Sequence, residues 1–169
     1  MAANFLEELL AEWYEYEGYL VRRNVWVGKR PEGGYECELD IVAFNPETNH
    51  LVQVEPSMDS QTWADRDRRY KKKFDAGRKH IPGLFAGIEL PSKIEQIGVL
   101  VYASKETNRT VAGGRLVHIS KILTEIFSAL KDQKVGSNAV PEHMPILRAF
   151  QFVNEYRMAI QSVWDNDIP

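Results

Sequence analysis

The chain has 169 residues, a formal net charge of −3 at pH 7 and a pI near 5.8. Its length suits a single domain with a substantial core, and its 44% hydrophobic and 27% charged residues are ordinary for a soluble globular protein. No apolar run approaches the ~20 residues needed to span a bilayer, so we expect no membrane partner. The single cysteine, Cys37, excludes an intramolecular disulfide, and with an acidic N-terminus unlike a secretory signal it favours the cytoplasm.

Hydrophobic periodicity predicts, in chain order, a helix, three strands, a helix, two strands and two helices. The ranges are 3–16, 19–27, 35–44, 50–55, about 61–79, 96–103, 113–119, 121–130 and 145–164. We expect Ser57 to Ser60 to cap the second helix and the apolar strand 96–103 to be buried on both faces. The order is that of a mixed α/β (α+β) domain, with helices flanking a five-stranded sheet. We expect the core to span 1–133; residues 134–169 would form a linker and a last helix that packs on the core or on a partner, such as a second copy in a homodimer.

The stretch 35–57 carries the most chemical information. Alternation along it places Asp40 on one face of its strand, with Gln53 and Glu55 together on a face of the next strand. Two hairpin registers are open, because a four-residue loop sets Asp40 opposite Gln53 and a six-residue loop sets Asp40 opposite Glu55. In either register the three polar side chains lie close together.

Two carboxylates and an amide on facing strands are costly to bury without a cation or a hydrogen-bond donor. Hard oxygen ligands of this kind suit Mg²⁺ or Mn²⁺. The alternative is a sheet with one solvated face, on which these acidic residues have no special role.

The helix that follows the hairpin is strongly basic although the whole chain is acidic. Residues 65–79 hold eight Lys or Arg against three Asp, and such a stripe is suited to a phosphate backbone or is an ordinary solvated face. On the helical wheel Lys71 and Lys73 flank the apolar stripe on opposite sides, so one of them is placed to lean over the sheet. We expect Trp63 and Tyr70 to be core residues.

The element order, with Asp40 on the second strand and Gln53-Val-Glu55 on the third, resembles the PD-(D/E)xK nuclease superfamily, which has the restriction-endonuclease-like fold. The resemblance covers roughly residues 3–130 and leaves the last helix as an addition. Gln is found at the first position of the family's ExK motif in Mrr-like enzymes. This chain departs from the pattern at Glu55, where the family usually has Lys. Some members carry a carboxylate there, others recruit a lysine from the following helix, and others are not catalytic.

The resemblance implies a Mg²⁺- or Mn²⁺-dependent nuclease that acts on DNA. The metal ligands would be Asp40, Glu55, the backbone carbonyl of Val54 and, from the first helix, Glu17. Gln53 would orient the attacking water, and Lys71 or Lys73 would supply the missing positive charge. Contacts to the phosphate backbone, and a steep salt dependence, would come from Arg66, Arg69, Lys72, Arg78 and Lys79.

Two other functions remain open from the sequence. One is a nucleic-acid-binding protein of the same fold that does not cleave, because the usual ExK lysine is absent. The other is a protein-interaction domain in which the acidic first helix and the terminal helix carry the function.

Overall fold

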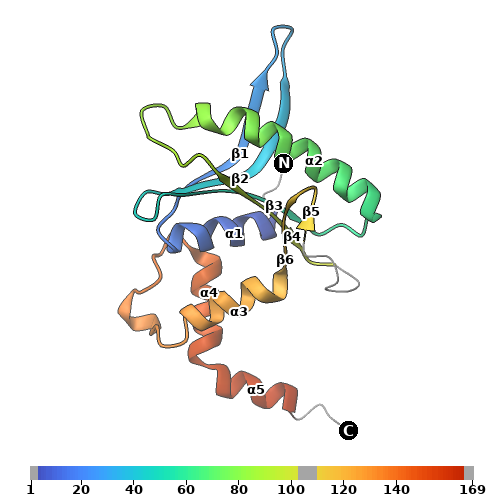
Figure 1. Ribbon diagram of the computed structural model, residues 1–169. Coiled ribbons are helices and arrows are strands. Elements are labelled where there is room, and N and C mark those ends of the chain that lie inside the picture. Colours follow the sequence, from blue (N-terminus) through green and yellow to red (C-terminus); the bar gives the residue numbers. More distant parts are fainter. Residues whose placement is uncertain (1–3, 103–109, 166–169) are drawn as a thin grey trace. The chain divides into compact units, whose positions relative to one another are not determined.

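The computed structural model of the protein describes residues 4–102 and 110–165 (Figure 1). The helices and strands, including the short 3-10 helices η1 and η2, are α1 (Phe5–Tyr16), β1 (Leu20–Lys29), β2 (Tyr35–Asn45), β3 (His50–Ser57), α2 (Trp63–His80), η1 (Ile81–Leu84), β4 (Ile94–Leu100), β5 (Thr110–Val111), β6 (Gly114–His118), α3 (Ile119–Ala129), η2 (Val135–Ser137), α4 (Pro145–Glu155) and α5 (Arg157–Asp165).

The sheet is mixed and has strand order β1-β2-β3-β4-β6-β5 in the described part of the chain. The expected antiparallel meander is confirmed for β1, β2 and β3, whereas β4 runs parallel to β3, and β6 parallel to β4. The sheet has six strands where the sequence predicted five, because Thr110–Val111 pairs with the start of β6. The two-residue strand is too short to produce a pattern. Strand β4 lies between β3 and β6 and is buried from Gln96 to Leu100, as predicted. It ends at Leu100, however, so the predicted range of 96–103 is too long: Val101 is half-buried, Tyr102 is exposed, and residue 103 lies outside the described residues.

The β2–β3 hairpin adopts the second of the two open registers. Asn45 pairs with His50 and Ile41 with Val54, so continuing the register sets Asp40 opposite Glu55. The recorded pairing ends at Ile41 and Val54, and the backbone N–H of Asp40 donates instead to the Glu55 carboxylate at 3.4 Å. The strand ladder therefore gives way to side-chain contacts at the predicted site.

The alternation along β2 is not regular, which corrects the sequence expectation. Cys37 and Leu39 pack in the same apolar cluster as Val42 and Phe44, so the inward-facing set slips by one residue between Leu39 and Val42. The pairing with β1 passes over Asp40 and its counterpart Asn24, whose φ of +51° lies in the left-handed region. Irregularities of this kind locally bend a strand and re-aim a side chain.

Helices α1 and α2 cover opposite faces of the sheet (Figure 1). Leu6, Leu9 and Leu10 of α1 are buried. On α2, Tyr70 and Phe74 are buried at 2% and 0% exposure and pack with Leu100 of β4. Trp63 is 36% exposed, so the expectation that it is a core residue is wrong.

The N-terminus of α2 is set by Thr62 and not by Ser57 to Ser60. The Thr62 hydroxyl accepts from the backbone N–H of Asp65 and donates to its carboxylate at 2.7 Å. Ser57 belongs to β3 and contacts Asp59. Threonine is a strong N-cap as well, but a row of polar residues does not reveal which of them has the required geometry.

Residues 1–119 and 120–169 form two compact units. The helix expected over 121–130 is α3, which starts at Ile119 and lies almost wholly in the second unit. The last predicted helix is two helices, α4 and α5, separated at Tyr156. None of the helices within residues 4–102 and 110–165 combines the length and apolarity that crossing a membrane requires.

Candidate active site

The ammonium group of Lys73 lies on the two acidic residues that the sequence singled out. Its Nζ donates to Asp40 Oδ1 at 2.5 Å and to Glu55 Oε2 at 2.6 Å. Asp40 comes from β2, Glu55 from β3 and Lys73 from α2, so three elements converge on one cluster. The cluster is well shielded, since the Glu55 side chain is 2% exposed and that of Lys73 is 22% exposed.

The charges in this cluster strongly perturb one another. Burial raises the pKa of Glu55 well above its ordinary value; the nearby Asp40 carboxylate raises it further, while Lys73 opposes the rise. Burial by itself would lower the pKa of Lys73, but the negative charges of Glu55 and Asp40 outweigh it and leave that pKa raised. Lys73 therefore stays charged at neutral pH, whereas Glu55 is a carboxyl group that readily takes up a proton.

Gln53 holds the Glu55 carboxylate in place. Its Nε2 donates to Glu55 Oε1 at 2.8 Å and to the backbone carbonyl of Lys73 at 3.1 Å. Its Oε1 accepts from Gln96 Nε2 at 2.7 Å, and Gln96 also donates to the Phe74 carbonyl. The Arg78 guanidinium donates to Gln96 Oε1 and completes the chain. Gln96 is a site residue that the sequence analysis missed, although its position as a polar residue within a buried strand was a signal.

Helix α2 approaches the sheet closely at Gly77. A Cβ atom at that position would lie 1.9 Å from Gln53 Oε1, so only a glycine permits this packing distance. The close approach allows the Gln53 amide to bond the helix backbone.

The first helix contributes a different acidic residue from the one expected. Glu7 lines a pocket of about 200 Å³ together with Asp40, Glu55 and Lys73. Burial and the Asp40 charge raise the pKa of Glu7. Glu17, in contrast, ends α1 and is exposed, and its carbonyl accepts from Asn45 at the far end of β2. The structure thus brings Glu7, not Glu17, to the cluster.

Three other residues that the sequence analysis proposed for the site form no side-chain hydrogen bond or ion pair with the Asp40 and Glu55 carboxylates. Lys71 is exposed and pairs with Asp75, so of the two candidate lysines only Lys73 reaches the carboxylates. Val54 lies between Ile41 and Ile97 in the sheet, and the ligand role of its carbonyl stays a prediction. Lys72 is exposed.

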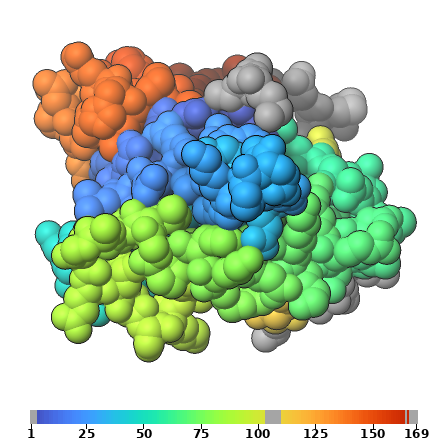
Figure 2. Space-filling model, turned by 90° about the horizontal axis from the view of Figure 1, so that it is seen from above, coloured from blue at the N-terminus to red at the C-terminus, as the bar shows by residue number. Residues whose placement is uncertain are grey.

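The other basic residues mostly have acidic partners. Lys79 pairs with Glu36 at 2.8 Å, where the β1–β2 hairpin, blue in Figure 2, lies beside the green α2. Arg78 pairs with Asp75. The side chain of Arg66 is only 4% exposed and that of Arg69 is 37% exposed; both bind Asp59. The basic stripe is therefore less open than its composition suggested, and Arg66 in particular is not a surface residue.

Asp59 ties the two arginines to the end of β3. Its carboxylate receives hydrogen bonds from the guanidinium of Arg69 and from the Ser57 hydroxyl, and these outweigh the effect of burial and lower its pKa to about 2. Because the pKa of Asp59 is lower in the folded than in the unfolded protein, its ionised carboxylate stabilises the folded state above the unfolded pKa of about 3.9. This contribution is lost as pH falls toward 2.

We expect Asp59→Asn to lower the free energy of unfolding at pH 7 by no more than about 1 kcal/mol, since the carboxylate is partly exposed and solvent screens it. The deficit should shrink between about pH 4 and pH 2, where the wild-type carboxylate also becomes neutral. Urea unfolding at several pH values measures both effects. A deficit independent of pH would assign the loss to packing and not to charge.

The donor types in this cluster, although not their present arrangement, suit a hard divalent cation. Asp40, Glu55 and Glu7 offer only carboxylate oxygens, and the unfavourable burial of Glu55 is the kind of cost that a bound cation offsets. Within the described ranges, no group of three or more His, Cys, Asp or Glu residues is arranged to hold a metal ion, and it is the Lys73 ammonium that bridges Asp40 and Glu55.

Comparison of the chain with family models, with curated proteins and with solved structures gives no match.

Proposed function

We propose that the protein is a metal-dependent nuclease that hydrolyses phosphodiester bonds of DNA, with a restriction-endonuclease-like fold and a Gln53-x-Glu55 motif in place of ExK. The observation that supports this most is the position of Lys73. Its ammonium, supplied by α2, lies on both Asp40 and Glu55. In the superfamily that the chain resembles, some members lack the usual ExK lysine and use a lysine from the following helix in its place. Lys73 would have this role here, because Glu55 occupies the usual lysine position.

Asp40 and Glu55, with Glu7 beside them, are the residues that would hold Mg²⁺ or Mn²⁺. Such an ion lowers the pKa of a bound water and offsets charge that develops on the scissile phosphate.

The chain's own groups have distinct tasks in this proposal. Lys73 uses two of its three N–H donors on Asp40 and Glu55, which leaves the third for a phosphate oxygen or for the attacking water. Glu55 would be either a ligand of the metal or the base that accepts a proton from that water. Gln53 orients the Glu55 carboxylate, and the exposed Lys72 adds positive charge for the phosphate backbone.

The direct test is cleavage of supercoiled plasmid and of single-stranded DNA by wild type and by Asp40→Asn, in Mg²⁺, in Mn²⁺ and in EDTA. We expect metal-dependent cleavage by the wild type and a loss of at least about 10²-fold in the variant, because Asp40 shares the charge of the metal site. Calorimetric titration with Mn²⁺ should show binding that Asp40→Asn and Glu7→Gln weaken. Glu17→Gln is the matched control and should bind as wild type does.

A nucleic-acid-binding protein without cleavage activity is the second candidate. The observation that favours it is that Lys73 already compensates the charges of Asp40 and Glu55 without a cation. DNA binding that is indifferent to Mg²⁺ and unaffected by Asp40→Asn, with no cleavage, would establish this function and contradict the nuclease proposal.

A further inference from the structure

A second pocket lies where β3 and β4 end. It has a volume of about 430 Å³ and is lined by Ser60, Gln61, Thr62, Trp63, Arg66, Val101 and Tyr102. The first five of these residues follow β3 and the last two follow β4, which runs parallel to it. The carboxyl ends of adjacent parallel strands are the usual place for ligands in α/β sheets. We call this cavity the Arg66 pocket.

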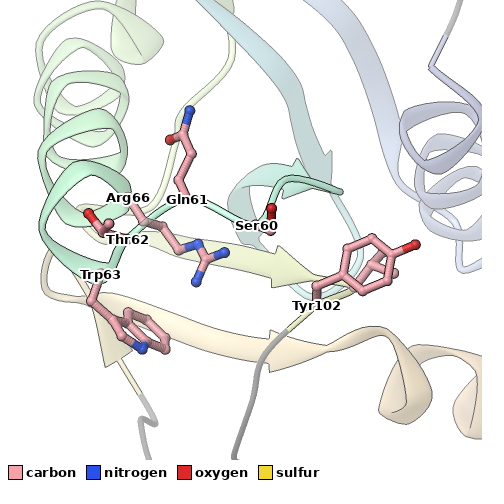
Figure 3. Close-up of a pocket in the computed structure, with 7 residues that line it drawn as sticks. Ser60, Gln61, Thr62, Trp63, Arg66 and Tyr102 are labelled. Atoms are coloured by element: carbon pink, nitrogen blue, oxygen red, sulfur yellow. The ribbon is translucent and has the colours of Figure 1, made fainter.

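Arg66 gives this pocket an unused hydrogen-bond donor. The residue is 3% exposed, and its NH2 group donates to the carbonyl of Asp59 at 3.1 Å and to its carboxylate at 3.4 Å. Its Nε has no hydrogen-bond partner. Buried donors are nearly always satisfied, so this donor requires an acceptor that the described residues do not supply. Figure 3 shows the guanidinium pointing into the space between Trp63 and Tyr102.

The charge of the pocket suits an anion. It lies at the N-terminus of α2, an 18-residue helix whose first turn carries partial positive charge. Asp59 is shared between Arg66 and Arg69, and Asp65 is paired with Arg68. Because the single Asp59 carboxylate is shared by two arginines, a net positive charge remains beside the helix N-terminus and can attract a phosphate.

Two aromatic rings make the pocket suitable for a base as well. Tyr102 is 63% exposed and Trp63 is 36% exposed, and the Arg66 guanidinium lies 5.0 Å from the centre of the Trp63 ring. Exposed aromatic rings beside a cationic group form the usual platform for the bases of single strands. Bases inside a duplex are stacked on one another and do not offer a free face.

The Arg66 pocket and the candidate active site both lie beside the face of α2 that carries Arg66, Tyr70 and Lys73. Arg66, Tyr70 and Lys73 recur at helical spacing, and Lys73 is about 10 Å farther along the axis than Arg66 at 1.5 Å per residue. Arg69 lies between them, lines the pocket that contains Asp40 and Glu55, and shares Asp59 with Arg66. A strand whose phosphate reaches Lys73 would extend naturally to the Arg66 pocket.

We propose that the Arg66 pocket receives one unpaired nucleotide of the substrate strand, with its phosphate on Arg66 and the N-terminus of α2 and its base against Trp63 and Tyr102. The inference rests on the proposed nuclease function and assigns that function a preference for single-stranded DNA or for ends and flaps that carry an unpaired segment.

The test measures binding and not cleavage, in EDTA and in the Asp40→Asn background, by fluorescence anisotropy of octathymidylate labelled at its 3′ end. We expect Trp63→Ala to weaken binding about tenfold, and Tyr102→Ala to weaken it as well. Trp63→Phe, which keeps a stacking surface, should restore most of the affinity. Trp26→Ala is the matched control, since Trp26 is 52% exposed on the β1–β2 hairpin, and it should bind as the parent does. The affinity of each of these four variants for a blunt duplex of equal length should differ less than twofold from that of the Asp40→Asn parent.

The outcomes separate the two proposals. Affinity for octathymidylate that is equal in Trp63→Ala and Trp26→Ala, or absent in the parent, would overturn the assignment of the Arg66 pocket, whether or not the wild type cleaves DNA. Binding that depends on Trp63 without any cleavage by the wild type would support the pocket and contradict the nuclease. If thymidine monophosphate binds in a Trp63-dependent way and octathymidylate does not, the pocket is a site for free nucleotides and the strand assignment is wrong.

Discussion

Replacing Lys73 with methionine should reduce metal-dependent DNA cleavage about 10²- to 10³-fold, the range for loss of one well-placed electrostatic group. Methionine has a similar length but no charge and no donor, so Asp40 and Glu55 would lose the ammonium that both of them contact. Initial rates of plasmid nicking under saturating Mg²⁺ measure the effect. Lys71→Met is the matched control: Lys71 lies two residues away on the same helix but is exposed and pairs with Asp75, so its rate should stay within about twofold.

The stability of Lys73→Met provides an independent check of the same geometry. Removing one partner of a buried ion pair costs about 3–5 kcal/mol when the other charge remains. Glu55 already has a raised pKa, and a carboxyl whose folded pKa is raised stabilises the fold at low pH and loses that contribution as pH rises through the folded pKa. Lys73 opposes this rise, so its removal should raise the pKa of Glu55 further, and the stability deficit of the variant should grow as pH increases above the unfolded value of about 4.5 in urea unfolding. A lost cleavage rate together with wild-type stability at all pH values would contradict burial of the cluster.

The second large effect is expected at Gly77. Alanine is the better helix former by about 1 kcal/mol, so on an exposed helix Gly→Ala would stabilise the protein. Here the new Cβ would lie 1.9 Å from Gln53 Oε1, and the Gln53 amide is held by Glu55, Gln96 and the Lys73 carbonyl. Neither the helix backbone at position 77 nor the Gln53 side chain can move freely. We therefore expect the free energy of unfolding to fall by about 2 kcal/mol, which is typical of overpacking, and DNA cleavage to be reduced.

Gly83→Ala is the control for Gly77→Ala, because a Cβ at Gly83 meets no atom within 4 Å. Thermal unfolding of both variants and of wild type gives the comparison. If Gly77→Ala is as stable as Gly83→Ala, α2 does not approach β3 as closely as described, and the hydrogen bond from Gln53 to the Lys73 carbonyl would be in doubt.

Local sequence patterns predict most of the secondary structure and identify the acidic pair. Apolar periodicity was sufficient for α1, α2 and the three-strand meander, since side-chain alternation and helical spacing depend on local burial. The hairpin predicted from the sequence also places Asp40 and Glu55 close together, because an antiparallel hairpin allows only a few registers. The helical wheel shows that Lys71 and Lys73 flank the apolar stripe of α2. It does not show which side of the stripe faces the carboxylates, so the choice between the two lysines stayed open.

Which side chains meet at the site depends on tertiary packing. The choice of Lys73 over Lys71 depends on how α2 is rotated against β3, which the close approach at Gly77 fixes. The choice of Glu7 over Glu17 depends on which end of α1 lies beside the break in the β2–β3 pairing. The burial of Arg66 and the exposure of Trp63 follow from where the chain turns from β3 into α2. The choices of Lys73 and Glu7 depend on contacts between segments distant in sequence, and a local pattern carries no information about the relative placement of such segments.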